Sequence, residues 1–397
     1  MSPSDAGRTG PRVLLVCSGL DHAHRGYESF ARECFEQLHA EEALRIELVK
    51  GSGPNGLDEM SFPTLRRDRR IARALGRALG ARPFRIEALA FAASLQPLLT
   101  RRRPDLVYMS EWDTARGLAL LRRLLGQRFK LLLCNGGFAE TGFDHLDHVQ
   151  ELTPVALDHV LAGGADPARH SLLPLGFDIP RDYVPVNADE QQALRAKWEL
   201  PLERPIVVSL AALNRSHKRL GYLIDELAAV AEPRPFVLLV GEPDDETPEL
   251  RSYASERLGP NGHRFLTVAA HEVPELLRAS DAFVLTSLAE MQGRAVIEAM
   301  GEGLPCLVHD SPVMRFAVGE EGLLADFELP GSLTQMLIQG LARATDPESP
   351  RRRHYHVYER FGWEALRPRY VQLLTDAAYG RAANRIVSSS AGEKLSR

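Results

Sequence analysis

Short apolar runs recur along this chain, and each precedes a polar or glycine-bearing loop and then a helical pattern. The clearest runs cover residues 12–17 (RVLLVC), 130–134 (KLLLC), 205–210 (PIVVSL), 236–240 (FVLLV) and 282–285 (AFVL). Such a run suits a parallel strand that is buried on both faces, because helices cover both sides of a parallel sheet. The alternation occupies both halves of the sequence. It predicts an α/β protein with two doubly wound, Rossmann-like domains.

The length and composition agree with this class. A chain of 397 residues exceeds one ordinary core, and 44% hydrophobic with 25% charged residues is typical of globular protein. The net charge of -5 gives no reason to expect nucleic acid as a partner. No apolar run is long enough to span a membrane, and the first residues lack the apolar core of a secretory signal. We therefore expect a cytoplasmic protein.

The four cysteines are scattered, with no C-x-x-C pair. Their spacing argues against a zinc site and favours small buried side chains in a reducing compartment. A proline-bearing stretch at 180–187 is typical of a linker. We divide the chain into a disordered tail (1–11), a first domain (12–182), a second domain (183–361), a C-terminal helix returning to the first domain (362–379) and a second disordered tail (380–397). A cleft between two such domains is the expected place for a ligand.

The stretch 286–303 (TSLAEMQGRAVIEAMGEG) has the clearest chemical pattern. After an apolar strand it presents Glu290 in a polar loop, then Gln292 and Gly293, and then a helix that opens with Arg294. Free amides at a helix N-terminus attract an anion. A second carboxylate, Glu298, follows on this helix and can accept hydrogen bonds from hydroxyls. Its structural alternative is an ion pair with Arg294 one turn earlier.

A basic loop at 214–219 (NRSHKR) follows the first strand of the second half. Lys218 precedes a helix predicted at 220–230, where a cation opposes the helix dipole. A bound diphosphate would remove that conflict, whereas the alternative is a solvated basic surface. In the first half, the loop 18–26 (SGLDHAHRG) ends at Gly26 before a helix with a full apolar stripe. Backbone amides in such a loop can also approach a phosphate.

Two further segments have alternative interpretations. Residues 66–103 contain eleven arginines, and Ile71, Leu75 and Leu79 share one helical face, with Arg70, Arg73 and Arg77 opposite. This pattern fits an amphipathic helix with a solvated basic face, or a surface for an anionic acceptor or an anionic membrane. Residues 143–148 (FDHLDH) hold two histidines and two aspartates. We favour an exposed polar turn over a metal site there.

These features, in this order, resemble the retaining glycosyltransferases of family 4, which have the two-domain GT-B fold. The resemblance covers about residues 12–378 and rests on 25–28 (RGYE), 173–178 (LPLGFD), 217–219 (HKR), Gly241, the E-x7-E pattern from Glu290 to Glu298, 303–305 (GLP) and 361–363 (FGW). It implies transfer of a hexose-type unit from a UDP- or GDP-sugar to an acceptor hydroxyl, with retention of anomeric configuration. The first domain would bind the acceptor and the second the nucleotide sugar.

The resemblance also implies residue roles. Lys218 would bind the donor diphosphate, and the backbone at Gln292 and Gly293 would hold phosphate beside the helix of Arg294. Glu298 would bind the ribose hydroxyls, and Glu290 would contact the donor sugar near the reacting carbon. The loop at Gly26 would close on the phosphates. Lys218 and backbone amides would meet the leaving-group charge, so no metal or cofactor is expected.

Two positions depart from the family pattern. The family commonly has an arginine five or six residues before the lysine; this chain lacks it, and Arg215 is the expected substitute. The family also often has a histidine after the strand at 130–134. This chain has Asn135 followed by Gly136, and an asparagine is neither an acid nor a base, so His145 is the candidate stand-in on the acceptor side.

Two other functions stay open at this point. One is a GT-B nucleotide-sugar epimerase, which needs no acceptor, and the other is a non-catalytic nucleotide-sugar-binding module. The expected partners are a nucleotide-sugar donor and a sugar, lipid-linked or small-molecule acceptor. Peripheral contact with an anionic membrane through residues 66–103 belongs to the same expectation. The sequence does not specify the base, the sugar or the acceptor.

Overall fold

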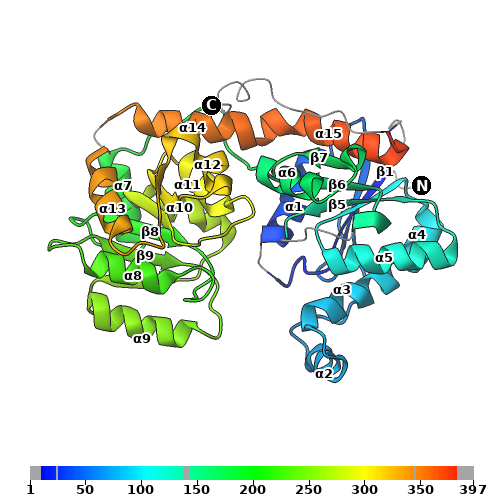
Figure 1. Cartoon of the computed structure of the whole chain (residues 1–397), viewed down its shortest axis with the longest axis horizontal. Helices are drawn as coiled ribbons and strands as arrows, with labels where there is room; N and C mark the ends of the chain where they lie inside the picture. The colour runs from blue at the N-terminus through cyan, green and yellow to red at the C-terminus, as the bar shows by residue number, and fades with distance from the viewer. Residues whose placement is uncertain (1–9, 24–25, 138–142, 344–345, 382–397) are drawn as a thin grey trace. The chain divides into compact units, whose positions relative to one another are not determined.

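The structure is a computed structural model that describes residues 10–23, 26–137, 143–343 and 346–381. The chain divides into two compact units (Figure 1). Unit 1 comprises the chain up to Gly176 together with the part from Trp363 onward, and unit 2 comprises Phe177–Gly362. The division thus falls after Gly176, whereas the sequence suggested a boundary after residue 182. Residues 1–9 and 382–397, most of the two expected tails, lie outside the described residues.

Among the described residues of unit 1, seven strands form one sheet in the order β3-β2-β1-β4-β5-β6-β7, and all neighbours are parallel. The strands are β1 (Arg12–Cys17), β2 (Arg45–Lys50), β3 (Glu59–Ser61), β4 (Leu106–Met109), β5 (Lys130–Asn135), β6 (His148–Glu151) and β7 (His170–Leu172). The central strands are almost wholly buried, as the apolar runs require.

The helices of unit 1 supply the other half of its core. They are α1 (Gly26–Leu38), α2 (Arg70–Leu79), α3 (Pro83–Ser94), α4 (Gln96–Arg102), α5 (Trp112–Leu125), α6 (Pro154–Ala162) and α15 (Trp363–Tyr379). The predicted apolar stripe of α1, including Phe30, Cys34 and Leu38, is buried. Helix α15 packs on α1, β4 and β5, and the Tyr370 hydroxyl donates to the carbonyl oxygen of Pro174 at 2.8 Å.

Unit 2 repeats the architecture. Its described strands form a parallel sheet in the order β10-β9-β8-β11-β12-β13. They are β8 (Ile206–Leu210), β9 (Phe236–Val240), β10 (His263–Leu266), β11 (Ala282–Leu285), β12 (Cys306–His309) and β13 (Leu323–Ala325). The helices are α7 (Ala188–Lys197), α8 (Leu220–Ala228), α9 (Thr247–Leu258), α10 (Val273–Arg278), α11 (Arg294–Gly301), α12 (Pro312–Val318), α13 (Ser332–Arg343) and α14 (Ser349–Phe361). The predicted pair of doubly wound Rossmann-like domains is confirmed.

The strand order fixes where each unit can hold a ligand. In unit 1 the order reverses between β1 and β4, and in unit 2 it reverses between β8 and β11. At such a reversal the loops after the two strands diverge to opposite faces of the sheet and leave a crevice at the carboxyl ends. In unit 2, the loops in question contain Lys218 and Glu290.

Several elements were not predicted. They include β3, β6, β7, β13, α6 and α7, which are short or polar in sequence. The four cysteines are buried with free thiols, as expected. Across the described part of the chain, no helix has both the length and the apolar character needed to cross a bilayer.

Candidate functional site

The loop between β8 and α8 holds the backbone of Lys218 from two sides. The side chain of Asn214 accepts a hydrogen bond from the Lys218 amide at 2.8 Å, and the Thr286 hydroxyl donates to the Lys218 carbonyl oxygen at 2.7 Å. The next residue, Arg219, has a left-handed backbone with φ 52°. These contacts join the loop after β8 to the end of β11 and fix where the lysine side chain begins.

The Lys218 side chain meets Glu290. Its Nζ atom lies 2.5 Å from Glu290 Oε1, and the two side chains are 18% and 15% exposed. The pair lies at the strand-order reversal of unit 2, because its members follow the neighbouring strands β8 and β11. Lys218 lies before α8, where the helix dipole disfavours a positive charge, and the Glu290 carboxylate offsets that effect. The pair is partly solvated, so a ligand can compete for either member.

Gly293 forms the turn from the Glu290 loop into α11. Its backbone is left-handed with φ 78° and ψ 53°. A larger residue would be strained in this backbone conformation, and its Cβ atom would lie 2.6 Å from Met314 Cε, so the end of the methionine side chain would have to move. Among the described residues, no side chain caps α11. The turn therefore leaves the N-terminal end of α11 without a side-chain acceptor, which is the arrangement that attracts an anion.

Glu298 lies on α11, with Oε1 3.4 Å from a guanidinium nitrogen of Arg294. The i, i+4 pair anticipated as its structural alternative therefore forms. At 3.4 Å and with the Glu298 side chain 35% exposed, such a pair contributes little to stability. Burial raises the pKa of the Glu298 carboxyl, and Arg294 opposes the rise. The Arg294 guanidinium also stacks on Phe177, 4.6 Å from the ring centre.

Arg215 lies in the same loop as Lys218, but its side chain faces α9. Its guanidinium is 4.4 Å from the ring centre of Tyr253 and 2.9 Å from Glu249 Oε1. The structure therefore brings Lys218 together with Glu290 but does not bring the Arg215 side chain to them. Glu249 is 75% exposed, so this pair is weak and does not hold the arginine in place.

Some residues that shape this site were missed in the sequence. Asn214 and Thr286 anchor Lys218. Gln292, which the sequence did predict, is 2% exposed. Ser287 is also 2% exposed, and its hydroxyl has no hydrogen-bond partner among the described residues. An asparagine four residues before a helix-leading lysine is a readable turn signal. No comparable signal marks Thr286, whose hydroxyl is ordered only by tertiary contact.

In unit 1, Gly26 begins α1, and Arg25 lies outside the described residues. The Tyr27 hydroxyl donates to the carbonyl oxygen of Gly136 at 2.5 Å. Burial raises the pKa of Tyr27 to about 12, so this phenol is a donor at any physiological pH. A Cβ at Gly136 would lie 2.6 Å from the Tyr27 ring. The loop after β5 is thus held close against the start of α1.

Asn135 is buried, and its amide nitrogen donates to Glu151 Oε2 at 2.9 Å. The other oxygen of Glu151 lies 3.0 Å from His170 Nδ1. His145 stacks edge-on against Trp112 with ring centres 5.5 Å apart. The sequence expected Asn135 and His145 on one acceptor side; no described hydrogen bond links them.

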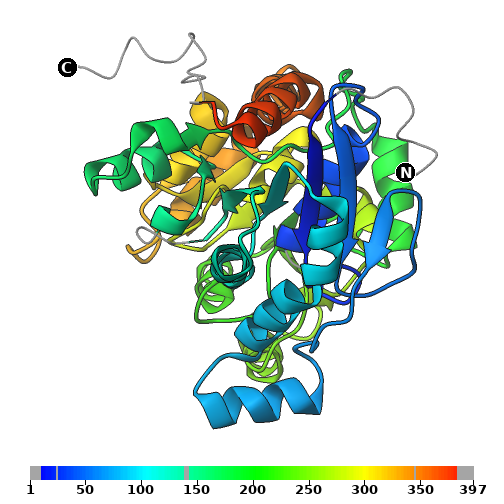
Figure 2. The ribbon, with the colours of Figure 1, turned by 90° about the vertical axis from the view of Figure 1, so that its right-hand side faces the viewer.

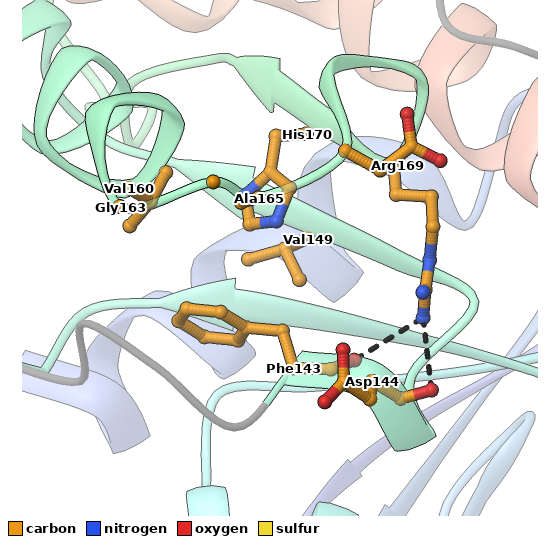
Figure 3. Close-up of a pocket in the computed structure, with 10 residues that line it drawn as sticks. Phe143, Asp144, Val149, Val160, Gly163, Ala165, Arg169 and His170 are labelled. Carbon is orange, nitrogen blue, oxygen red and sulfur yellow. Dashed lines mark hydrogen bonds between the residues drawn. The ribbon is translucent and has the colours of Figure 1, made fainter.

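Unit 1 also contains a cavity of about 190 Å³, which is lined by residues between Phe143 and His170 (Figure 3). Phe143 and His170 face it, and Arg169 bridges its rim by donating to the carbonyl oxygens of Phe143 and Asp144, each at 3.2 Å. The segment 143–148 does not gather a metal-ligand set. No group of three or more histidine, cysteine, aspartate or glutamate side chains in the described ranges could hold a metal ion.

At the strand-order reversal of unit 1, the equivalent place is filled by a buried carboxylate. Glu111 accepts hydrogen bonds from the Ser18 amide and hydroxyl at 3.1 and 2.6 Å and from the Thr114 hydroxyl at 2.8 Å. The Glu111 side chain is 2% exposed, and burial raises its pKa. This carboxylate joins the loop after β1 to the loop after β4.

Comparison with known proteins places these observations in a class. Residues 204–343 match the family model described as "Glycosyl transferases group 1". The matched range contains Lys218, Glu290 and Glu298 but covers less than half of the chain. The chain also aligns with mannosylfructose-phosphate synthase of Agrobacterium fabrum at 30% identity over 193 residues, which is 45% of this chain and 42% of that protein. The chain spans about half the length of the first curated relatives it matches, with shares of 42% and 52%.

Solved structures resemble the chain over nearly its whole length. Sucrose-phosphate synthase from Thermosynechococcus elongatus superposes with a TM-score of 0.73 at 18% identity, covering 91% of this chain and 98% of that chain. The HepE protein of Anabaena, solved in complex with UDP and glucose, gives 0.70 at 17% identity, covering 92% and 100%. At these identities the likeness concerns the fold. The predicted GT-B fold class is confirmed.

Proposed function

We propose that this protein is a glycosyltransferase that moves a sugar from a nucleoside diphosphate sugar to an acceptor hydroxyl. The observation that carries the proposal is the Lys218–Glu290 ion pair at the strand-order reversal of unit 2, beside the uncapped end of α11. It lies inside the range that matches the glycosyl transferase family model. The name of the Agrobacterium relative and the UDP and glucose in the HepE structure support sugar transfer from a nucleotide donor.

The roles proposed for unit 2 follow from charge. Lys218 binds the diphosphate, and the backbone at Gln292, Gly293 and the first turn of α11 holds phosphate oxygens. Glu298 accepts hydrogen bonds from the ribose hydroxyls, with Arg294 keeping its carboxylate ionised. Leaving-group charge is met by lysine and amides, so we propose transfer without a metal. We also propose retention of anomeric configuration, which rests on the family resemblance.

Donor binding then involves an exchange of partners. Without ligand, Lys218 is neutralised by Glu290 at 2.5 Å. An incoming diphosphate presents more negative charge than one carboxylate, so it displaces Glu290 from the lysine. The released carboxylate becomes available to the donor sugar near its reacting carbon. In this scheme the same glutamate holds the empty site neutral and orients the sugar in the loaded site.

We propose further roles for residues that do not contact the Lys218–Glu290 pair. Gly26 contributes a phosphate contact through its backbone. Arg215 adds charge after leaving Tyr253 and Glu249, which hold it by a stacking contact and an exposed pair. On the acceptor side we propose Asn135 and Gly136 as the loop that contacts the acceptor, with His145 as a candidate proton carrier. The acceptor is a sugar, a lipid-linked sugar or a small molecule.

The first test is thermal unfolding with UDP-glucose, UDP-galactose and GDP-mannose. A ligand at about 100 times its dissociation constant adds about 2.7 kcal/mol to stability, which raises the midpoint by a few degrees. We expect one donor class to stabilise the wild type and to do so much less in Lys218→Met. No stabilisation by any nucleotide sugar would contradict the proposal. Binding without turnover would favour a binding module, and a product isomeric with the donor would favour an epimerase.

A further inference from the structure

The cavity of unit 1 lies where α6 meets the β6–β7 end of the sheet (Figure 3). Val149 on β6 and His170 on β7 are direct partners in the parallel register, so their side chains lie on the same face of the sheet. Val160 of α6 and the ring of Phe143 form further walls. The chain after α6, residues 163–165 (GGA), also lines the cavity but has almost no side-chain volume. The space between helix and sheet is therefore left unfilled.

His170 is held through one of its two ring nitrogens. Its Nδ1 atom lies 3.0 Å from Glu151 Oε1, and the other oxygen of Glu151 accepts a hydrogen bond from the Asn135 amide at 2.9 Å. Because the carboxylate oxygen accepts, Nδ1 is the donor, and Nε2 is left as the second hydrogen-bonding atom of the ring. Within the described residues, Nε2 makes no hydrogen bond.

The Nε2 atom of His170 opens into the cavity. The side chain is only 2% exposed, yet the protein does not seal this nitrogen off. Since the ring lines the cavity, the surface that Nε2 keeps is cavity surface. An edge-to-face contact with Phe143, with ring centres 5.3 Å apart, fixes the plane of the imidazole. Polar atoms at such depth almost always have a partner, so this one calls for a partner inside the cavity.

The size of the cavity suits a single ring. Its volume of about 190 Å³ equals that of about six water molecules, and an apolar cavity of about 150 Å³ can hold one benzene molecule. The side chains of Phe143, Val149 and Val160 give it apolar walls. A six-membered ring with one small substituent therefore fits, whereas a nucleotide or a disaccharide is too large.

The charges around the cavity disfavour a charged ligand. Asp144 and Asp166 are exposed lining residues and outnumber Arg169, whose guanidinium already donates to backbone carbonyl oxygens. Glu151, fully buried behind His170, adds further negative charge and so opposes an anion. A cation would exchange its hydration for apolar walls and one ring nitrogen, which is costly. A hydroxyl is neutral and can donate or accept, so it pairs with Nε2 in either protonation state of the imidazole.

We propose that this cavity binds a small neutral ring compound that carries one hydroxyl group, as phenols and cyclic alcohols do. The hydroxyl forms a hydrogen bond with His170 Nε2, and the ring packs against Phe143, Val149 and Val160. Glu151 acts as a positioning residue, because it holds Nδ1 and turns Nε2 toward the ligand. The inference stands on unit 1 alone and does not depend on sugar transfer.

Four probes built on one aromatic ring test the proposal. Phenol, toluene, benzoate and benzylammonium are titrated into the full-length protein without any nucleotide sugar, and ligand-observed NMR gives each Kd. We expect a Kd of about 1 mM or tighter for phenol. Toluene should bind at least about fivefold more weakly, because its methyl group leaves Nε2 unpaired. The two charged probes should bind at least about tenfold more weakly. Failure of phenol to bind, or binding of another probe as tightly as phenol, would overturn the proposal.

Variants locate the binding. Ala165→Leu places a larger side chain at the cavity wall and leaves His170 and Glu151 in place, so phenol should bind at least about tenfold more weakly. Ala162→Leu makes the same change at an exposed position that does not line the cavity, and it should bind phenol as the wild type does. Both variants should keep the wild-type unfolding midpoint. Unchanged phenol binding by Ala165→Leu, or equal weakening by both variants, would contradict the site.

The hydroxyl contact has a test of its own in His170→Phe. This variant keeps an aromatic ring but lacks Nε2, so phenol and toluene should bind it within about twofold of each other. The ratio of the two Kd values is read within one variant and is therefore independent of the stability lost when Glu151 loses its partner. A preference for phenol as large as that of the wild type would refute the contact with His170. The probe series on the wild type decides the proposal even where a variant folds poorly.

Discussion

The two units place different chemistry at the same point of the same topology. At the reversal in unit 2, Lys218 and Glu290 form an ion pair that remains 15–18% exposed. At the reversal in unit 1, Glu111 is 2% exposed and accepts hydrogen bonds from three donors, which are the amide and hydroxyl of Ser18 and the hydroxyl of Thr114. A buried carboxylate whose acceptor sites are filled by the protein cannot be offered to a ligand without breaking the fold. A partly solvated pair can change partners at small cost.

A reversal of strand order therefore predicts where a crevice lies, but it does not predict which kind of ligand the crevice binds. In unit 2 the crevice holds exchangeable charge, which suits a diphosphate. In unit 1 the corresponding charge ties two loops together, and further buried groups nearby do the same. Glu87 is fully buried and lies 2.5 Å from His22, and it also pairs with Arg67. At its strand-order reversal, unit 1 can therefore recognise a ligand by surface shape and backbone groups, because the charged side chains there already have partners.

The sharpest way to test the contrast is Lys218→Met. If the lysine neutralises a leaving diphosphate, its loss should lower kcat/KM for the donor by about 10²–10³-fold, the usual cost of removing one electrostatic contact to a developing charge. The unfolding midpoint should change little, because the pair is partly exposed. Steady-state kinetics with the donor found in the thermal screen gives the answer. A loss smaller than threefold would remove Lys218 from the mechanism.

The corresponding substitution at the strand-order reversal of unit 1 is Glu111→Ala. It leaves the buried Ser18 amide and the two hydroxyls without an acceptor, so we expect a loss of about 1–3 kcal/mol in the free energy of unfolding. Donor affinity should stay within about twofold. Glu42→Ala, at an exposed glutamate of the same unit, is the control and should be neutral within about 0.5 kcal/mol. Equal effects of the two substitutions would show that Glu111 is dispensable.

Gly293→Ala should destabilise unit 2 by straining the turn that leads into α11. The left-handed backbone costs about 1–2 kcal/mol for a non-glycine residue, and the contact with Met314 Cε adds to it. Met314 is buried, so Met314→Ala is destabilising by itself, and the steric part is the coupling free energy of the double-mutant cycle of Gly293→Ala and Met314→Ala. Chemical denaturation of the single and double variants separates the two terms. A neutral Gly293→Ala would mean that the turn has another accessible conformation.

Glu290→Ala should have opposite effects on binding and on transfer. Removing the carboxylate leaves Lys218 without its 2.5 Å partner, so a diphosphate no longer competes with it. We expect UDP or GDP to bind about threefold to tenfold more tightly, while sugar transfer falls by at least about 100-fold. Calorimetric titration with both nucleotides measures the first effect. Weaker nucleotide binding would refute the exchange of partners between Glu290 and diphosphate.

The smallest expected effect is a pH dependence at Glu298. Burial raises the pKa of this carboxyl above its ordinary value of 4.5, so the folded chain keeps the proton longer than the unfolded chain as pH rises. The free energy of unfolding should therefore decline as pH rises above about 4.5, relative to Glu298→Gln. Arg294→Gln should steepen the decline, because Arg294 opposes the shift. Denaturation at pH 4.5 and 7 checks the sign; a rise instead of a decline would contradict it.

How far the sequence predicts this protein depends on the kind of signal. Apolar runs and glycine turns identified the central strands and gave α11 its observed bounds, Arg294–Gly301, because burial on both faces leaves a strong compositional trace. Strands β6 (HVQE) and β7 (HSL) were missed, since their polar side chains are buried through specific partners such as Tyr108 to Gln150 and Ser171 to His148. Only the fold supplies those partners.

The site shows the same limit. The pattern of Glu290, Gly293 and Glu298 could be read directly, because each residue type has a local reason at its position. The ion pair could not, because Lys218 and Glu290 are 72 residues apart and meet only through the pairing of β8 with β11. For α2, the period of the apolar residues predicted a helix correctly. It could not say that the apolar side, where Ile71 is 64% exposed, would face outward, since periodicity does not reveal what covers a face. Figure 2 shows α2 projecting from unit 1 at the bottom of the view.

Unit 1 is built from both ends of the chain, and this has a consequence for biosynthesis. Helix α15 packs on α1, β4 and β5, and Tyr370 closes a buried contact with Gln150 and Pro174. The ribosome delivers α15 only after all of Phe177–Gly362 has been made. Unit 2 is therefore the first to have its complete set of elements, although it comes second in the sequence. During synthesis, the nascent first unit must keep the surface that α15 will cover from aggregating until the last helix emerges.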